Sequence, residues 1–176
     1  DVFAPIIQSS KKRSIWLGVN LITAFIAVYF IGLFEATLQQ KIALAILMPV
    51  VASMGGIAGT QTLIIVTRGI ATGRVTTANI KALINKEVAV SGLNGIIWSI
   101  VIGLITYYWF SDMLLSLIIA LAIITNLVVA AFSGAFLPLL LSKLRIDPAL
   151  AGGVILTTIT DVIGFVAFLG LASLFI

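Results

Sequence analysis

Apolar residues form five long stretches along the chain, and most of the charged residues lie between them. The predicted spans are 14–34, 42–67, 88–110, 113–141 and 149–175. Each is long enough to cross the hydrocarbon core of a bilayer, which takes about 17 to 25 residues of helix. Only helices and closed barrels satisfy the backbone within lipid, and these runs lack the alternation of barrel strands. The pattern therefore predicts an all-α integral membrane protein with five transmembrane helices.

The composition agrees with this interpretation. Hydrophobic residues make up 61% of the 176 positions, charged residues make up 9%, and the mean hydropathy is +1.28. A soluble core does not require such an apolar excess. The length suits one compact bundle rather than two domains. Cysteine and histidine are absent from the sequence, which excludes disulfides, thiolate metal sites and imidazole ligands.

The basic residues predict the orientation of the bundle. Of the ten Lys and Arg residues, three precede the first span, four lie in the second junction and two lie in the fourth, whereas the opposite side carries Lys41 alone. Loops rich in Lys and Arg remain in the cytoplasm. We therefore expect a multi-pass protein of the plasma (inner) membrane with a cytoplasmic N-terminus and an external C-terminus. Because the charges are spread over short loops, they do not indicate nucleic-acid binding.

Two segments outside the spans carry further expectations. Residues 1–13 end in a basic cluster and are interpreted as the residual connecting segment of a removed cytoplasmic region, which leaves 14–176 as the five-helix transmembrane pore domain. In the second junction, Thr76, Thr77 and Asn79 precede a pattern typical of a short amphipathic helix at the membrane surface. A solvated connector is the alternative.

Asp161 is the strongest candidate for a functional residue. It lies near the middle of the last span, and no other charged residue occurs from Pro148 to Ile176. A carboxylate at that depth costs roughly 2.5 to 3.5 kcal/mol on insertion scales, so it needs water, a cation, a partner or a proton. Helical spacing puts Thr157 and Thr158 one turn before it. This part of the helix is therefore predicted to be an oxygen-rich patch on a transport path.

The second span contains a dense run of small residues. Gly55, Gly56, Gly59 and Thr60 follow Pro49 within a few positions. Small residues allow two helices to approach closely, and they also allow a helix to unwind so that its carbonyl groups face a cavity. The sequence pattern is compatible with both alternatives.

The available ligands limit the cargo. Carboxylate, hydroxyl, carbonyl and water oxygens suit hard cations such as Mg²⁺, Ca²⁺ or Mn²⁺. Mg²⁺ gives up its water reluctantly, so a site with few protein ligands suits a hydrated ion. One carboxylate does not neutralise a divalent ion, whereas a symmetric dimer supplies Asp161 twice. This predicts a homodimeric bundle with a pore at the subunit interface.

Three stretches resemble the MgtE magnesium channel family. Residues 49–73, which contain Gly-Gly-Ile-Ala-Gly-Thr-Gln and Arg-Gly-Ile-Ala-Thr-Gly, resemble its second membrane helix. Lys86-Glu87 matches the pair that opens its third helix, and Asp-Pro-Ala-Leu at 147–150 with Thr-Asp-Val-Ile-Gly at 160–164 resembles its fifth. The similarity extends from residue 14 to the end of the chain. The family motif Gly-Gly-Asn-x-Gly-Asn-Gln is altered, with Ile57 and Thr60 at the two Asn positions.

The resemblance implies a homodimeric, magnesium-selective channel with its pore between the second and fifth helices of the two subunits. It also implies that Asp161 binds the hydrated ion and that the cytoplasmic regulatory domains of the family are absent from this fragment. Because the two motif asparagines are replaced, we predict that Asp161 and the backbone oxygens of Gly56 and Gly59 carry the site. Thr60 and Thr157 are predicted to form its polar wall.

Two other functions remain open at this point. In a proton-coupled divalent cation carrier, Asp161 would bind H⁺ and substrate alternately, and in a structural subunit it would only bond across helices. No nucleophile–base pair or phosphate loop is recognisable, so an enzyme is not predicted. Glu87 is interpreted mainly as an acid at a helix N-terminus, favoured by the dipole and by Lys86. Attraction of cations or transfer of a proton is the alternative role for Glu87.

Overall fold

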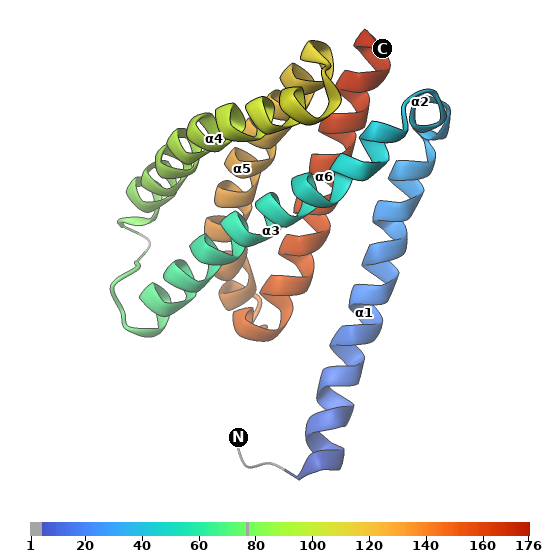
Figure 1. Ribbon diagram of the computed structural model, residues 1–176. Helices are drawn as coiled ribbons and strands as arrows, with labels where there is room; N and C mark the ends of the chain where they lie inside the picture. The colour runs from blue at the N-terminus through green and yellow to red at the C-terminus, as the bar shows by residue number, and fades with distance from the viewer. Residues whose placement is uncertain (1–4, 77) are drawn as a thin grey trace.

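The computed structural model describes residues 5–76 and 78–176, and the regular structure in them is helical. The helices are α1 (Ile6–Gly32), α2 (Glu35–Gln40), α3 (Ile42–Ala71), α4 (Ile80–Phe110), α5 (Met113–Lys143) and α6 (Pro148–Phe175). Five of them, all except the short α2, are long and apolar enough to cross a membrane. This confirms the predicted all-α integral membrane fold. In Figure 1, α1 begins at the lower end of the bundle and α6 finishes at the upper end, as an odd number of spans requires.

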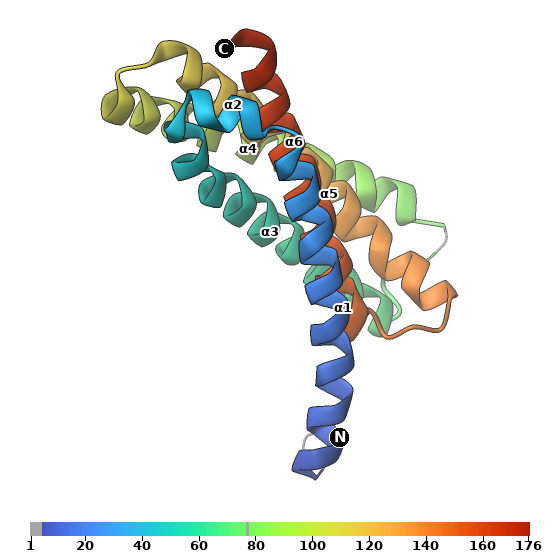
Figure 2. The ribbon, with the colours of Figure 1, turned by 90° about the vertical axis from the view of Figure 1, so that its right-hand side faces the viewer.

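Helix α5 forms the centre of the bundle. Helices α3, α4 and α6 pack around it, whereas α1 lies at the edge and packs mainly against α6 (Figures 1 and 2). Half of the most apolar 18-residue window of α5 is buried, compared with 6% of that of α1. Large apolar side chains cover much of the outer surface, as a protein surrounded by lipid requires. The fully buried apolar core includes Leu44, Val51, Ile119, Ile123, Leu156 and Phe168.

Local sequence explains where α5 and α6 begin. Asp112 caps α5 by accepting a hydrogen bond from the Leu115 N–H at 2.9 Å. Asp147 caps α6 by accepting from the Ala149 N–H at 2.9 Å, and Pro148 occupies the first turn. Acids and proline are both favoured at helix N-termini. The predicted starts of these two spans are confirmed to within one residue.

The first span is longer than predicted. Helix α1 begins at Ile6, whereas the hydropathy pattern put the start of the span at residue 14. Most of the predicted connecting segment is therefore helical and continuous with the span. With 27 residues at about 1.5 Å each, α1 is roughly 40 Å long and exceeds the hydrocarbon core of about 30 Å. Its first turns, which carry three basic residues at positions 11–13, extend beyond the apolar layer.

The second junction also differs from the prediction. The expected short surface helix is not a separate element, because its residues form the first turns of α4. No glycine or proline interrupts α4 before Gly92, so the helix runs directly from the polar junction into the span. Asn79 precedes α4, but its side chain orders the loop instead of capping the helix, since its Nδ2 donates to the Arg74 carbonyl at 2.7 Å. The predicted contribution of Thr77 lies outside the described residues.

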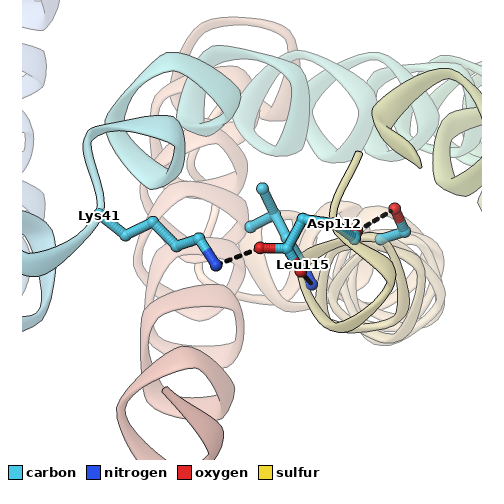
Figure 3. A network of polar contacts seen from close by, with 4 residues as sticks. Lys41, Asp112 and Leu115 are labelled. Atoms are coloured by element: carbon cyan, nitrogen blue, oxygen red, sulfur yellow. Dashed lines mark hydrogen bonds and ion pairs between the residues drawn. The ribbon is translucent and has the colours of Figure 1, made fainter. Parts of the chain in front are cut away.

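An ion pair joins two connections at one end of the bundle. Lys41, immediately before α3, donates to the Asp112 carboxylate, immediately before α5 (Figure 3). The backbone N–H of Leu115, and after it the Lys41 ammonium, hold the pKa of Asp112 below its ordinary value, because both stabilise the charged carboxylate. The pair helps to fix the position of α3 relative to α5.

Candidate functional site

Antiparallel packing of α3 against α6 brings the two candidate stretches to the same depth. Gly59 of α3 lies against Leu156 of α6, and Val51 of α3 lies against Gly164 of α6. Asp161 lies between these contacts on α6, and the glycine-rich stretch at 55–60 reaches between them on α3. The fold thus places the last-span acid level with the small residues of the second span.

Asp161 lies half-buried at the middle of α6, as the fourteenth of its 28 residues. Within residues 5–76 and 78–176, no hydrogen bond or ion pair reaches its carboxylate. Its neighbour Thr160 is fully buried and Thr157, one turn earlier, is exposed, so Asp161 lies at the border between the packed face of α6 and its open side. A carboxylate at this depth needs a cation, a proton or water from outside the described chain.

The threonines of the predicted polar wall bond to their own helices. Thr157 Oγ1 donates to the Gly153 carbonyl at 2.8 Å, and Thr60 Oγ1 donates to the Gly56 carbonyl at 2.7 Å. Both side chains are exposed. Because each hydroxyl proton is already used, the oxygen remains free to act as an acceptor. Acceptors of this kind match the water molecules of a hydrated cation, which present O–H donors.

Gly56 and Gly59 occupy different environments. A Cβ on Gly56 would meet no atom within 4 Å, whereas a Cβ on Gly59 would lie 2.9 Å from the Leu156 side chain. Gly59 therefore permits a close crossing of α3 and α6. Helix α3 is continuous through this stretch, so the interpretation as a helix crossing is confirmed and the unwound alternative is wrong. The carbonyls of both glycines lie within an α-helix, where backbone N–H groups already bond to them.

Asn126 of α5 is a residue that sequence reasoning does not select, although it joins three helices close to the depth of Asp161. Its side chain is fully buried, and its Nδ2 donates to the Val51 carbonyl at 2.9 Å. The amide lies against Gly55 of α3 and Gly164 of α6, where any Cβ would collide with it. In the part of the chain that the structure describes, Asn126 Oδ1 has no hydrogen-bond partner. The sequence signal for this contact among three helices was an asparagine within the long apolar run 113–141.

The chemistry of the site is that of a single carboxylate with neutral oxygen acceptors nearby. Over residues 5–76 and 78–176, no group of three or more acidic side chains could enclose a metal ion. One carboxylate with hydroxyl acceptors suits a hard cation that keeps its water, since a bare ion would need several direct ligands. The arrangement supplies one negative charge per chain.

Comparison with known proteins relates this arrangement to transporters. A model of the MgtE divalent cation transporter family matches residues 48–171. Magnesium transporter MgtE of Bacillus subtilis is 34% identical over 168 residues, which is 96% of this chain and 37% of that protein. Magnesium transporter MgtE of Enterococcus faecalis is 27% identical over 169 residues, again 96% of this chain and 37% of the relative.

A third relative, magnesium transporter MgtE of Thermus thermophilus, is 30% identical over 160 residues, or 90% of this chain and 35% of that protein. The chain thus spans little more than a third of the length of the curated relatives it matches. All three relatives are named as transporters, not as enzymes. Since the family model covers more than half of the 176 residues, including both α3 from Met48 onward and Asp161, the chain belongs to the MgtE family of divalent cation transporters.

Proposed function

We propose that this domain is a magnesium channel in which Mg²⁺ passes down its electrochemical gradient, hydrated or partly hydrated, between two copies of the chain. The observation that carries the proposal is the Asp161 carboxylate, which lies half-buried in the middle of α6 without a partner in the described residues. A carboxylate in the apolar layer costs several kcal/mol unless something compensates its charge. A passing cation supplies that compensation.

The ligand set supports a hydrated divalent ion. Asp161 accepts hydrogen bonds from the water shell, and the hydroxyl oxygens of Thr157 and Thr60 are free to do the same because their protons are bonded within the helices. The Gly56 surface leaves open space beside them. Mg²⁺ retains water more strongly than Ca²⁺ does, which favours Mg²⁺ at a site with few direct ligands. Mn²⁺ and Ca²⁺ are the alternative ions, and their uptake should be compared with that of Mg²⁺.

Charge balance supports a homodimer. One carboxylate leaves a divalent ion half-neutralised, whereas two copies related by a two-fold axis supply two. The polar and small residues on the open side of α3, Ser53, Gly56 and Thr60, are poor partners for lipid tails. An interface formed by α3 and α6 of both copies covers these residues and lines the pore with them.

The proposed orientation follows from the basic residues. With α1 starting in the cytoplasm, the ends of α3 and α5 that carry Arg68 and Lys143 face the cytoplasm, and the Lys41–Asp112 pair faces the exterior. A cytoplasmic region that regulates the channel would connect through the N-terminal end of α1. The location proposed for the assembly is the plasma (inner) membrane.

Flux in proteoliposomes tests the proposal. Wild-type protein is expected to take up Mg²⁺ without an imposed proton gradient, and Asp161→Asn is expected to reduce uptake by at least about tenfold because the ion loses its only charged ligands. Glu35→Gln, which neutralises an exposed acid of α2, serves as the control and keeps wild-type flux. If Asp161→Asn takes up Mg²⁺ as fast as wild type, Asp161 is not the ion-binding residue. If uptake strictly requires a proton gradient, the protein is a carrier and not a channel.

A further inference from the structure

A polar cavity that does not include Asp161 lies between α3 and α4. Both helices pack on α5 but have little direct contact with each other, which leaves a cavity of about 420 Å³ between them. Apolar side chains form part of its wall, together with Trp98. Its polar lining comes from Gln61, Thr62, Glu87, Ser91 and Asn94.

Glu87 is the charged group of this cavity. It is only 7% exposed, and its contact among the described residues is a hydrogen bond of 3.3 Å from Thr62 Oγ1. The sequence-based explanation by the helix dipole is wrong, because α4 begins at Ile80 and Glu87 lies two turns inside it, beyond the first turn where the dipole acts. No ion pair reaches its carboxylate from residues 5–76 or 78–176.

A buried carboxylate without a counter-charge is costly, so Glu87 requires either a proton or a positively charged ligand in the cavity. The neutral groups around Glu87 are hydroxyls and amides, and the Ser91 hydroxyl donates to the Leu127 carbonyl at 3.0 Å, which leaves its oxygen free as an acceptor. Oxygen ligands of this type select a hard cation. The volume accommodates a hydrated ion, since six waters at about 30 Å³ each occupy roughly 180 Å³.

The charges of the side chains in and beside the cavity indicate whether a monovalent or a divalent cation binds there. Among the residues that the structure describes, Glu87 is the one acid that lines the cavity, and α5 contributes only the apolar Leu127 to the lining. The charged side chains nearest along α3 and α4, Arg68 and Lys86, line the adjoining cavity, with which this one shares Ile65. A divalent ion would therefore leave an uncompensated positive charge beside two basic groups, whereas a monovalent ion neutralises Glu87.

We infer that the α3–α4 cavity is a binding site for a monovalent alkali cation of the sodium or potassium class, with Glu87 as its anionic ligand and Thr62 as a neighbouring hydroxyl ligand. The site lies within one protomer. On α3, Thr62 is two residues from Thr60 and hence about 200° around the helix from it, so the hydroxyl that bonds to Glu87 and the hydroxyl assigned to the proposed Mg²⁺ path lie on different sides of α3. The inference goes beyond the proposed function and does not depend on ion binding at Asp161.

Thermal unfolding of the purified chain in lipid nanodiscs provides the test, with NaCl or KCl compared against choline chloride at equal ionic strength. A ligand at ten times its dissociation constant is expected to raise the unfolding midpoint by roughly 3 to 6 °C. The inference predicts this shift for at least one alkali cation in wild type. It predicts loss of the shift in Glu87→Gln, which keeps the side-chain shape, and a smaller shift in Thr62→Val.

Two controls separate this site from others. Asp161→Asn and the exposed Glu35→Gln are expected to retain the alkali-cation shift. An independent readout uses Trp98, made the single tryptophan by Trp16→Phe and Trp109→Phe, whose emission changes on cation addition in wild type but not with Glu87→Gln. Absence of any alkali-cation effect, its persistence in Glu87→Gln, or replacement of it by a Mg²⁺ effect that Glu87→Gln removes would each overturn the inference.

Discussion

Gly134 of α5 offers a sharp test of how the bundle is held together. A Cβ at this position would lie 2.5 Å from the Gly59 carbonyl oxygen, 3.1 Å from Thr62 Cβ and 3.2 Å from the Leu63 backbone nitrogen. Two of these atoms are backbone atoms of α3, which do not move by a change of rotamer. Since non-bonded carbon atoms prefer separations of about 3.5 to 4.0 Å, Gly134→Ala forces the two helices apart.

The expected cost follows from these distances. Overpacking of a well-packed interior costs roughly 1 to 3 kcal/mol, and replacing a helical glycine by alanine returns up to about 1 kcal/mol. Gly18→Ala in α1 is the matched control, because a Cβ there meets no atom within 4 Å and only the gain in helix propensity applies. Because the gain in helix propensity is common to both variants and cancels, their free energies of unfolding should differ by the overpacking cost of about 1 to 3 kcal/mol, with Gly134→Ala the less stable.

Thermal unfolding in a single detergent measures the difference. For a chain of this size, about 1 kcal/mol corresponds to roughly 2 to 4 °C in the midpoint, so we expect Gly134→Ala to unfold about 2 to 12 °C below Gly18→Ala. If the two midpoints agree within about 2 °C, the α3–α5 contact is not the tight backbone crossing described above, and the reasoning is refuted.

Two further predictions concern polar groups that connect helices. Asp112→Asn should lower the free energy of unfolding by about 1 kcal/mol at neutral pH. Folding lowers the pKa of Asp112. The stability that its carboxylate contributes is therefore present above the ordinary pKa of 3.8 and is lost as the pH falls through the folded pKa. If the difference in unfolding midpoint between wild type and Asp112→Asn does not disappear at low pH, the stabilising role of the Asp112 carboxylate is contradicted. Asn126→Ala should lower the free energy of unfolding by roughly 1 to 3 kcal/mol, because it removes the hydrogen bond to the Val51 carbonyl and leaves a cavity among three helices. The unfolding midpoint measures this loss, and an unchanged midpoint would contradict the role of Asn126 in joining α3, α5 and α6.

Hydropathy alone predicted the architecture well where a span is bounded by helix-capping residues. The starts at Asp112–Met113 and Asp147–Pro148 are marked by local chemistry, and the structure confirms them. The starts of α1 and α4 were misplaced because these helices extend through polar residues beyond the apolar layer. Helix continuity depends on backbone hydrogen bonding, and it does not stop where hydropathy changes.

The candidate site was predictable only in part. The composition of α6 singled out Asp161, and the Gly59 contact with Leu156 explains why small residues occur in α3. The role of Asn126 and the environment of Glu87 were not predictable, because each depends on which helices become neighbours in space. A polar residue within an apolar run indicates that some compensation exists, but only the packing identifies the groups that provide it.

The central position of Asp161 along α6 has an electrical consequence. A charge halfway through the apolar layer experiences about half of the membrane potential, so a divalent ion held there feels the equivalent of one elementary charge crossing the whole field. That amounts to about 2.3 kcal/mol for every 100 mV, or roughly a fiftyfold change in equilibrium occupancy. An ion bound at this depth is thus drawn in or expelled by voltage, and the resting polarity of a cell, negative inside, favours its entry from the exterior.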